Sequence, residues 1–371
     1  MSGLLSYDPK HALNAICPYY TMFPLEYPFR ILRKHRKERP VVFDPFCGRG
    51  TTIYAARYLG LESWGIDTSP IAVAIAKAKL AVSSVDEVLD LASTYCKKTP
   101  RKIPETTFFR KAYRRRTLTQ ICAIREGLLR LKDETNASIL LKAAMLGCLH
   151  GPRSKHIAGA GYFSNQMPRT FSTKPDYSVE YWKDQRLIAP RVDVLNVLRR
   201  KLARIADIET EPEGLSGYVT CADARTISLR RNIQKKTSLV ITSPPYYGMR
   251  TYVEDQWLRM WFLGGPDSIE YGKATQISHG GQETFIDELA SVWERIAKSD
   301  ADTIDLYIRF GSVPSTKSDP RKIIKSSLEQ SGDWKLISVC NANTAEEGKR
   351  QADQMGTSSA ATEYDFHAVR N

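Results

Sequence analysis

A glycine-containing turn between a short apolar strand and a helix constrains this chain most. Residues Pro40–Asp44 are apolar and β-prone, and the turn Pro45–Gly50 leads into a helical stretch at Thr51–Leu59. A second short strand at Glu62–Asp67 precedes another helical stretch at Pro70–Leu80. Because two neighbouring parallel strands need a crossover between them, this order predicts an α/β fold with a parallel sheet.

Five further strands complete the predicted sheet. They are expected at Gly217–Ala222, Ser238–Thr242, Thr303–Phe310, Trp334–Cys340 and Glu363–Val369. Seven strands suit one Rossmann-like, mostly parallel sheet. Between the second and third strands, about 135 residues show helical patterns and loops. We therefore expect a catalytic domain formed by residues 1–80 and 216–371, interrupted by a large helical insertion at 81–215.

The chain is basic, and the excess of positive charge is concentrated in the predicted insertion. It contains 54 Lys and Arg residues against 41 Asp and Glu residues, a net charge of +13. From Lys97 to Lys155 there are 15 basic residues and 4 acidic ones. Lys and Arg placed against phosphates release condensed counterions and bind without regard to sequence. The insertion is thus predicted to bind a polyanion, with a merely solvated basic helix pair as the alternative.

Composition also argues against several classes of protein. No run approaches 18 uncharged apolar residues, so we expect no membrane span. The first residues lack a basic stretch followed by an apolar one, so we expect no signal peptide. We therefore expect the protein in the cytoplasm. The seven cysteines are scattered singly, with no CxxC pair and no zinc-type Cys/His spacing. We therefore expect reduced thiols and no metal.

The glycine turn has the features of a ligand-binding loop. Gly48 and Gly50, in DPFCGRGTT, allow a sharp turn and a close approach of the backbone to a ligand at a helix N-terminus. It is not a Walker loop, because no Lys-Ser/Thr follows the second glycine. Asp67 ends the second strand about 20 residues later, where a carboxylate can accept both hydrogen bonds of a ribose diol. The pattern predicts an adenosyl cofactor, and a solvated turn residue is the alternative for Asp67.

A second motif, TSPPYY at Thr242–Tyr247, follows the fourth predicted strand. Its two prolines stiffen the loop and remove two N–H donors, leaving carbonyl acceptors and one hydroxyl beside an aromatic ring. The exocyclic amine of a nucleobase is a poor nucleophile because its lone pair is delocalised. The Ser243 hydroxyl and the Pro244 carbonyl could orient its hydrogens, while the Tyr246 ring stacks on a base that has left the duplex. A rigid turn with core tyrosines is the alternative.

Together, DPFCGRGTT and TSPPYY resemble the S-adenosylmethionine-dependent amino-methyltransferases of DNA, which methylate the N4 of cytosine or the N6 of adenine. The resemblance covers the sheet-forming parts, about 235 residues, and leaves the insertion unmatched. It implies S-adenosyl-L-methionine as the cofactor and double-stranded DNA as the substrate. The SPPY form resembles the N4-cytosine enzymes, whereas Asp or Asn at the Ser243 position is more usual in the adenine enzymes. The usual context of the family also implies a companion restriction endonuclease.

The resemblance assigns roles to individual residues. The catalytic loop would consist of Ser243, Pro244, Pro245 and Tyr246. The implied cofactor-binding residues are Tyr20, Thr21, Asp44, Phe46, Gly48, Gly50, Asp67 and Asp223. Among them, Tyr20 and Thr21 would lie near the methionine moiety and Asp223 near the adenine.

The insertion is expected to hold DNA. The predicted phosphate-binding residues are Arg114, Arg115, Arg116, Arg153 and Lys155. Its segment Gly151–Lys183, rich in glycine, proline and aromatic residues, is expected to be an exposed binding loop. Trp257 and Trp261 share one helix face and are expected to pack in the core. Three histidines without triad or metal-ligand spacing are expected in loops or at the surface: His150, His156 and His279.

Other functions remain open at this point. An N6-adenine methyltransferase differs from the proposed N4 enzyme by one motif letter. Amino-methyltransferases of transfer RNA guanosine usually carry Asp in place of Ser243 and an N-terminal RNA-binding domain, and about 40 residues precede the glycine motif here. A cytosine-C5 enzyme needs a cysteine after a proline in its catalytic loop, and the chain has no Pro-Cys dipeptide. An inactive nucleic-acid-binding subunit is disfavoured by the intact set Gly48, Asp67, Asp223 and Ser243.

Overall fold

The computed structural model divides the chain into two compact units, each described here by itself. The described residues are 13–19, 24–152, 161–167, 174–203, 217–227, 237–248, 253–269, 281–312, 318–342 and 362–370. The sheet unit comprises Tyr19–Leu80, Pro212–Arg250 and Thr275–Asn371, and the helical unit comprises Met1–Pro18, Ala81–Glu211 and Thr251–Ala274. The helical unit therefore takes in the expected insertion together with segments that we had assigned to the catalytic domain.

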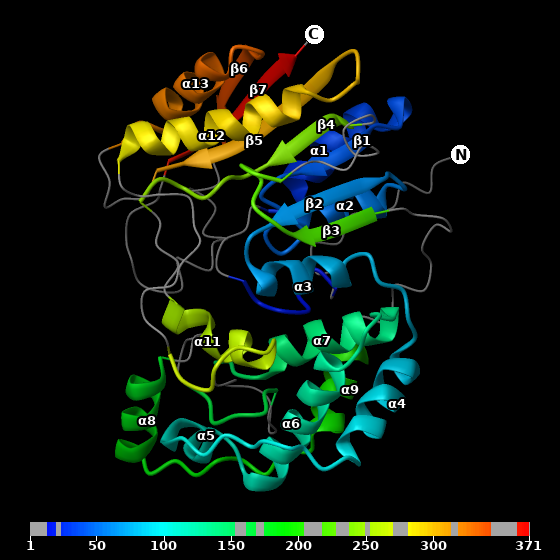
Figure 1. The fold of residues 1–371 in the computed structure, drawn as a ribbon, viewed down its shortest axis with the longest axis vertical. Coiled ribbons are helices and arrows are strands. Elements are labelled where there is room, and N and C mark those ends of the chain that lie inside the picture. Colours follow the sequence, from blue (N-terminus) through cyan, green and yellow to red (C-terminus); the bar gives the residue numbers. More distant parts are fainter. Residues whose placement is uncertain are drawn as a thin grey trace. The chain divides into compact units, whose positions relative to one another are not determined.

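The sheet unit contains seven strands in the order β3-β2-β1-β4-β5-β7-β6 (Figure 1). Their bounds are β1 Val41–Asp44, β2 Ser63–Asp67, β3 Gly217–Cys221, β4 Thr237–Thr242, β5 Ile304–Gly311, β6 Lys335–Asn341 and β7 Glu363–Arg370. The strand β7 runs antiparallel to β5 and β6, and the other pairings are parallel. The prediction of a seven-stranded, mostly parallel sheet is confirmed.

Helices of the sheet unit begin where local sequence signals place them. Their bounds are α1 Glu26–His35, η1 Arg36–Glu38, α2 Thr51–Tyr58, α3 Pro70–Ala78, α12 Gln282–Ala297 and α13 Pro320–Ser331. The Ser69 side chain accepts a hydrogen bond from the Ala72 amide at the start of α3, and Pro70 occupies the first helical position. Asp319 caps α13 in the same way, again before a proline.

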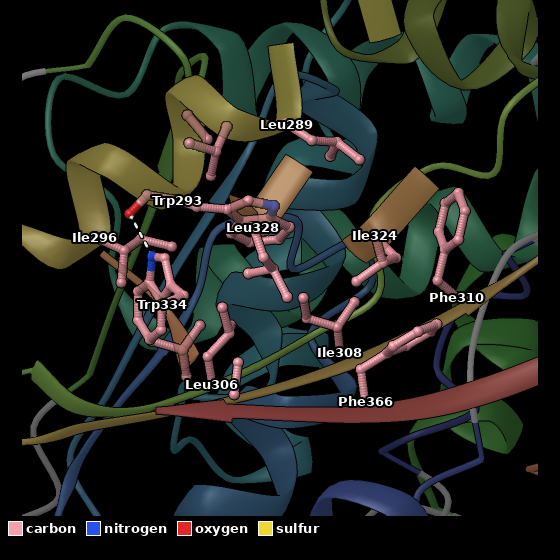
Figure 2. Close-up of a cluster of buried hydrophobic side chains, with 14 of the residues drawn as sticks. Leu289, Trp293, Ile296, Leu306, Ile308, Phe310, Ile324, Leu328, Trp334 and Phe366 are labelled. Carbon is pink, nitrogen blue, oxygen red and sulfur yellow. Dashed lines mark hydrogen bonds between the residues drawn. The ribbon is translucent and has the colours of Figure 1, made fainter. Parts of the chain in front are cut away.

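Two separate hydrophobic clusters hold these helices on the sheet. Trp293 and Leu289 of α12 and Leu328 of α13 pack with side chains of β5 and β7, and the Trp334 indole N–H donates to the Trp293 carbonyl at 3.2 Å (Figure 2). The second cluster joins Ile53 of α2 to Val73 of α3 and to β3. Different helices thus use different clusters, as expected for a doubly wound sheet, whose helices cover both faces.

The strand order reverses between β1 and β4. From β1 the chain winds outward through β2 to β3, whereas β4 leads outward to β5. In doubly wound sheets ligands bind beyond the carboxyl ends of the strands at such a switch point. Asp44, Asp67 and Thr242 are the last residues of β1, β2 and β4. The strand order therefore brings both sequence motifs to the carboxyl-terminal ends of two neighbouring strands, β1 and β4.

The helical unit is built around aromatic side chains. Its described helices are α4 Val85–Cys96, α5 Thr107–Ala112, α6 Arg115–Leu129, α7 Asn136–Cys148, α8 Pro175–Asp184, α9 Val194–Ala203 and α11 Val253–Phe262. Trp257 and Trp261 are buried and contact Phe109 with ring centroids 5.8 and 4.6 Å away, so the prediction that they pack in the core is confirmed. None of the helices in the described part of the chain combines the length and apolar character of a membrane span.

One expectation about this unit is wrong, and another is borne out in part. Described parts of Gly151–Lys183 are not an exposed loop, because Phe163 and Trp182 are fully buried and Trp182 belongs to α8. His150 lies in the bend that follows α7, in agreement with the expected loop position, but it is buried rather than at the surface, and its Nδ1 lies 2.8 Å from the Ser164 hydroxyl. Burial lowers the pKa of His150 to about 3, with a smaller contribution from Arg259, so its imidazole is neutral near pH 7. His156 and His279 lie outside the described residues.

Candidate functional site

The glycine turn is anchored to β2 by backbone hydrogen bonds. The Cys47 amide donates to the Ile66 carbonyl at 2.9 Å, and the Gly50 amide donates to the Cys47 carbonyl at 2.7 Å. Gly48 and Gly50 adopt φ values of +49° and +79°, which residues with a side chain rarely tolerate. The turn is thus a fixed bend whose glycines are required by backbone conformation.

The two glycines of the turn differ in their surroundings. A Cβ at Gly50 would lie 2.9 Å from both the Cα and the Cβ of Ala76 in α3, so this glycine allows two helices to approach. A Cβ at Gly48 would have no heavy atom within 4 Å. Gly48 therefore borders open space, as a residue must if its backbone is to meet a ligand.

Asp67 is tied to the turn. Its Oδ2 accepts from the Gly48 amide at 2.9 Å, and its Oδ1 accepts from the Ser69 amide at 2.8 Å. Burial raises the pKa of Asp67 above its usual value, and these two amide hydrogen bonds oppose the rise. Each oxygen retains further acceptor capacity, because a carboxylate offers about four lone-pair sites.

Asp44 is a buried carboxylate with one oxygen unsatisfied. Its Oδ1 accepts from the Thr242 hydroxyl at 2.7 Å and from the Phe46 amide at 3.1 Å. Its Oδ2 is also buried and has no hydrogen bond of good geometry to a described residue, although the nearby Thr52 hydroxyl helps to lower the pKa of Asp44. Desolvation raises the pKa of Asp44 to about 6, against the lowering effect of its hydrogen bonds. An unpartnered anionic oxygen inside a protein is costly, so this atom is suited to a cationic or hydrogen-donating ligand.

The end of β4, where the serine motif begins, is joined by two side-chain hydrogen bonds to the residues that flank the glycine turn. Besides the Thr242 contact to Asp44, the Thr52 hydroxyl at the start of α2 donates to the Ile241 carbonyl at 3.2 Å. Ser243 follows directly and is partly exposed, Pro244 is buried and Pro245 is exposed. The structure thus places the start of the serine loop beside the end of β1.

Tyr246 is held in a defined position. Its hydroxyl donates to Glu363 Oε1 at 2.8 Å, and its ring meets Phe310 edge-on with centroids 5.3 Å apart. A Cβ at Gly311 would lie 3.0 Å from the Tyr246 ring, so this glycine makes room for it. The side chain is only partly buried. A ring fixed in this way can offer a surface to a planar base without first becoming ordered.

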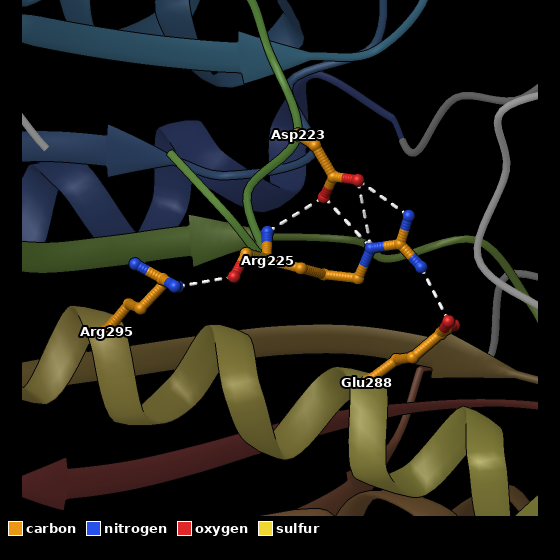
Figure 3. A network of polar contacts seen from close by, with 4 residues as sticks. All are labelled: Asp223, Arg225, Glu288 and Arg295. Atoms are coloured by element: carbon orange, nitrogen blue, oxygen red, sulfur yellow. Dashed lines mark hydrogen bonds and ion pairs between the residues drawn. The ribbon is translucent and has the colours of Figure 1, made fainter. Parts of the chain in front are cut away.

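Asp223 lies just beyond β3 and is engaged by a neighbouring arginine (Figure 3). The Arg225 guanidinium donates to Asp223 Oδ2 from Nη2 at 2.6 Å and to Oδ1 from Nε at 2.9 Å. Arg225 Nη1 also donates to Glu288 Oε1 of α12 at 2.6 Å. The hydrogen bonds from Arg225 lower the pKa of Asp223, which is therefore ionised at neutral pH. The Ala222 amide donates to the Asp67 carbonyl at 3.0 Å, which places this loop beside the end of β2.

The remaining predicted site residues have mixed outcomes. Phe46 packs edge-on against Trp293 with ring centroids 6.4 Å apart, so part of its surface serves the core. Arg114, Arg115 and Arg116 are exposed at the start of α6, and Arg114 also donates to the Ala189 carbonyl at 2.7 Å. Four predicted residues lie outside the described part of the chain: Tyr20, Thr21, Arg153 and Lys155.

Sequence inspection missed three residues near the carboxyl-terminal ends of the parallel strands. Thr242 is the first residue of the serine motif and was assigned no role of its own, although its hydroxyl makes the contact to Asp44. Glu363 has no local signal, because it meets Tyr246 only through the pairing of β7 with β5. Arg225 follows Asp223 by two residues, a spacing that permits a local ion pair and could have been noticed.

Comparison with known proteins gives one family match and one curated relative. Residues 4–78 match the family model of N6/N4 type described as DNA methylase. Over 71 residues the chain is 37% identical to the Type II methyltransferase M.MjaII of Methanocaldococcus jannaschii, a stretch covering 19% of this chain and 13% of that protein. The chain thus spans only a small part of the length of this curated relative.

Two solved structures are similar at low TM-scores. The rRNA methyltransferase aviRa from Streptomyces viridochromogenes has a TM-score of 0.32 and 13% identity, over 99% of this chain and 90% of that one. The magnesium protoporphyrin IX methyltransferase ChlM from Synechocystis, solved with bound SAM, has a TM-score of 0.34 and 8% identity, over 97% and 90%. Superpositions this loose do not bear on function.

The matched segment contains the glycine turn, Asp44 and Asp67, which is the part of the site whose geometry is described above. The resemblance seen in the glycine motif is therefore confirmed by an independent comparison, and the serine motif lies outside the matched residues. Residues 4–78 of the chain are thus similar to the DNA methylases of N6/N4 type.

Proposed function

We propose that this protein is a site-specific DNA methyltransferase that transfers a methyl group from S-adenosyl-L-methionine to the exocyclic N4 of cytosine in double-stranded DNA. One observation carries the proposal. The hydrogen bond from Thr242 to Asp44 joins the serine loop to the glycine turn at the switch point of the sheet. A cofactor loop and an amine-orienting loop can serve one transfer only if they border the same crevice.

The residues present fit the cofactor. The buried, unpartnered Asp44 Oδ2 suits a ligand that carries an ammonium group, and the open space beside Gly48 admits a ligand to the backbone. Asp67, held by the Gly48 amide, keeps acceptor capacity for a ribose diol. When bound, S-adenosylmethionine supplies a methyl group made electrophilic by its sulfonium.

The serine loop would act on the target amine. The Ser243 hydroxyl and the Pro244 carbonyl accept the two amine hydrogens, which turns the nitrogen lone pair out of conjugation and toward the methyl carbon. Bound S-adenosylmethionine would supply the methyl group and leave as the thioether S-adenosylhomocysteine, and the proton released by the methylated amine would pass to solvent. The Tyr246 ring, fixed by Glu363, stacks on the flipped base and offsets part of the few kcal/mol that unstacking costs. No covalent enzyme intermediate is required.

The choice of cytosine N4 rests on Ser243 as the first letter of the SPPY loop. An adenine-N6 enzyme is the second candidate, because the same geometry orients either amine. We also propose, from the usual context of the family, that a companion restriction endonuclease recognises the same DNA site.

The glycine turn offers a matched pair of variants. Gly50→Ala should lower the free energy of unfolding by roughly 2–4 kcal/mol, because it combines a left-handed backbone with a contact to Ala76. Gly48→Ala should cost only about 1 kcal/mol, yet weaken cofactor binding strongly by filling the open space. Urea unfolding and titration calorimetry would measure the two effects. Equal destabilisation by both variants, with unchanged cofactor affinity in Gly48→Ala, would contradict this division of roles.

Exposed arginines at the start of α6 are proposed to bind DNA phosphates. Because Arg114 also supports the Ala189 carbonyl, the cleaner variant is Arg115→Gln combined with Arg116→Gln. We expect weaker DNA binding and a salt dependence whose logarithmic slope is smaller by about 2, one unit for each lost phosphate contact. Binding titrations between low and moderate salt would measure it, and an unchanged slope would remove these residues from the interface.

The proposed function is tested by supplying labelled cofactor with duplex DNA or with transfer RNA. We expect label in DNA alone, with an initial rate of labelling at least about 100-fold lower for the Ser243→Ala variant. Label in transfer RNA but not in DNA would favour the RNA amino-methyltransferase alternative, and cofactor binding without any transfer would favour an inactive subunit.

A further inference from the structure

Arg225 occupies most of the hydrogen-bonding capacity of Asp223. Oδ1 accepts from the Arg225 backbone amide at 2.9 Å and from Nε at 2.9 Å. Oδ2 accepts from Nε at 3.0 Å and from Nη2 at 2.6 Å (Figure 3). Nε carries one hydrogen, which the two oxygens share, so three hydrogens fill most of the about four acceptor positions of the carboxylate. A ligand amine that approaches Asp223 therefore has to compete with the Arg225 guanidinium.

The surroundings allow the guanidinium to leave while the loop stays in place. Arg295 of α12 donates to the backbone carbonyls of Arg225 and Ile227, which holds the loop independently of the Arg225 side chain. The Arg225 backbone amide would continue to orient Asp223. Glu288 already accepts from Arg225 Nη1 and provides an alternative anionic partner for the released guanidinium.

The Asp223–Arg225 ion pair is bidentate and partly open to solvent. The side chains of Asp223 and Arg225 are 29% and 24% exposed, so solvent screens part of their attraction. Pairs of this kind shift an equilibrium by roughly fivefold, which corresponds to about 1 kcal/mol.

We propose that Arg225 determines the affinity of the adenine subsite: it covers Asp223 in the free protein and moves toward Glu288 when the adenine amine of the cofactor binds. This proposal rests on the proposed function, because it takes Asp223 as the adenine contact. Arg225 thus competes with the cofactor for the Asp223 carboxylate, and Glu288 favours the release of Arg225 from that carboxylate.

The test measures binding of S-adenosylhomocysteine by titration calorimetry, which needs no turnover. This probe carries no net charge near neutral pH, so a change in the protein's overall charge has little direct effect on it. Arg225→Met should bind the probe about fivefold tighter than the wild type. Glu288→Gln should bind it more weakly, because the released guanidinium loses its alternative partner. Arg225→Met and Glu288→Gln each remove one charge from the same network. General destabilisation would change the affinity for the probe in the same direction in both variants, whereas the proposal predicts opposite directions.

Two further variants complete the design. In an Asp223→Asn background the gain from Arg225→Met should disappear, because the competition is for the carboxylate. Arg321→Met is the matched control. Arg321 follows Asp319 by two residues at the start of α13, and its guanidinium donates to the Asp319 carboxylate. Its backbone amide also donates to Asp319 Oδ1, at 2.9 Å. This control should leave the affinity unchanged.

The outcomes separate the two proposals. If the wild type binds the probe and Arg225→Met binds it equally or more weakly, the role of Arg225 is overturned while the proposed function stands. A gain that persists with Asn at position 223 also overturns it. If the wild type fails to bind the probe at all, both proposals fall.

Discussion

Ser243→Ala is expected to lower the rate of methyl transfer by about 100-fold or more while changing cofactor affinity by less than twofold. Loss of one positioned polar group in a preorganised site typically has an effect of this size. Ser243 is partly exposed directly after β4, and its hydroxyl has no hydrogen bond to any described residue. Removing the hydroxyl should therefore leave the fold intact and deprive the target amine of one acceptor. Single-turnover rates and titration calorimetry would measure the two quantities.

A serine at the same edge of the sheet provides the control. Ser312 directly follows β5, and its amide donates to the Thr362 carbonyl. Ser312→Ala should leave both transfer and cofactor binding unchanged. Parallel loss of transfer rate and cofactor affinity in Ser243→Ala would contradict the role assigned to its hydroxyl, because it would indicate damage to the whole crevice.

Asp44→Asn is expected to stabilise the free protein above pH 6 while weakening cofactor binding at least tenfold. Burial raises the pKa of Asp44 from its ordinary value of 3.8 to about 6. The native state therefore binds more protons than the unfolded state between about pH 4 and 6, so stability falls as pH rises through this window. Ionisation of this buried group costs roughly 3 kcal/mol, which Asn does not incur. Asn keeps an oxygen for Thr242 but offers no charge to a cationic ligand.

Urea unfolding of wild type and variant at pH 5 and pH 7.5 would measure the stability effect. The variant's advantage should be larger at pH 7.5. Cofactor affinity of the wild type should fall as the pH drops below 6, because protonation removes the charge, whereas that of Asp44→Asn should be nearly flat over the same range. A variant that binds the cofactor as tightly as the wild type at pH 7.5 would show that the unpartnered oxygen does not face the ligand.

Much of the fold could be predicted because its signals are local. The seven strands lie within a residue or two of the expected ranges, and α3 begins at the proline that the sequence marks. The segment Gly151–Lys183 was misjudged because its glycines and aromatics were weighed by composition. The helix that begins at Pro175 buries Ser178, Val179 and Trp182, a spacing that already indicates a helical face.

The candidate site could be predicted where one strand–turn–helix–strand unit contains it. Asp44, Gly48 and Asp67 lie within 24 residues of one another, so the turn that joins the strands also positions them. The contact that fixes the position of Tyr246 could not be predicted. Glu363 lies beside Tyr246 only because β7 pairs antiparallel between β5 and β6. Contacts that depend on strand order over more than a hundred residues leave no local pattern.

Identification of the methylated nucleoside tests the account most directly. The protein would be incubated with duplex DNA and cofactor labelled in its methyl group, and the DNA would then be digested to nucleosides and separated. We expect the label in N4-methylcytosine, appearing at least about 100-fold more slowly after substitution of Ser243 by Ala. Label in 5-methylcytosine, which requires attack on a ring carbon, would contradict the amine-directed chemistry assigned to the serine loop, and label in N6-methyladenine would overturn the choice of base.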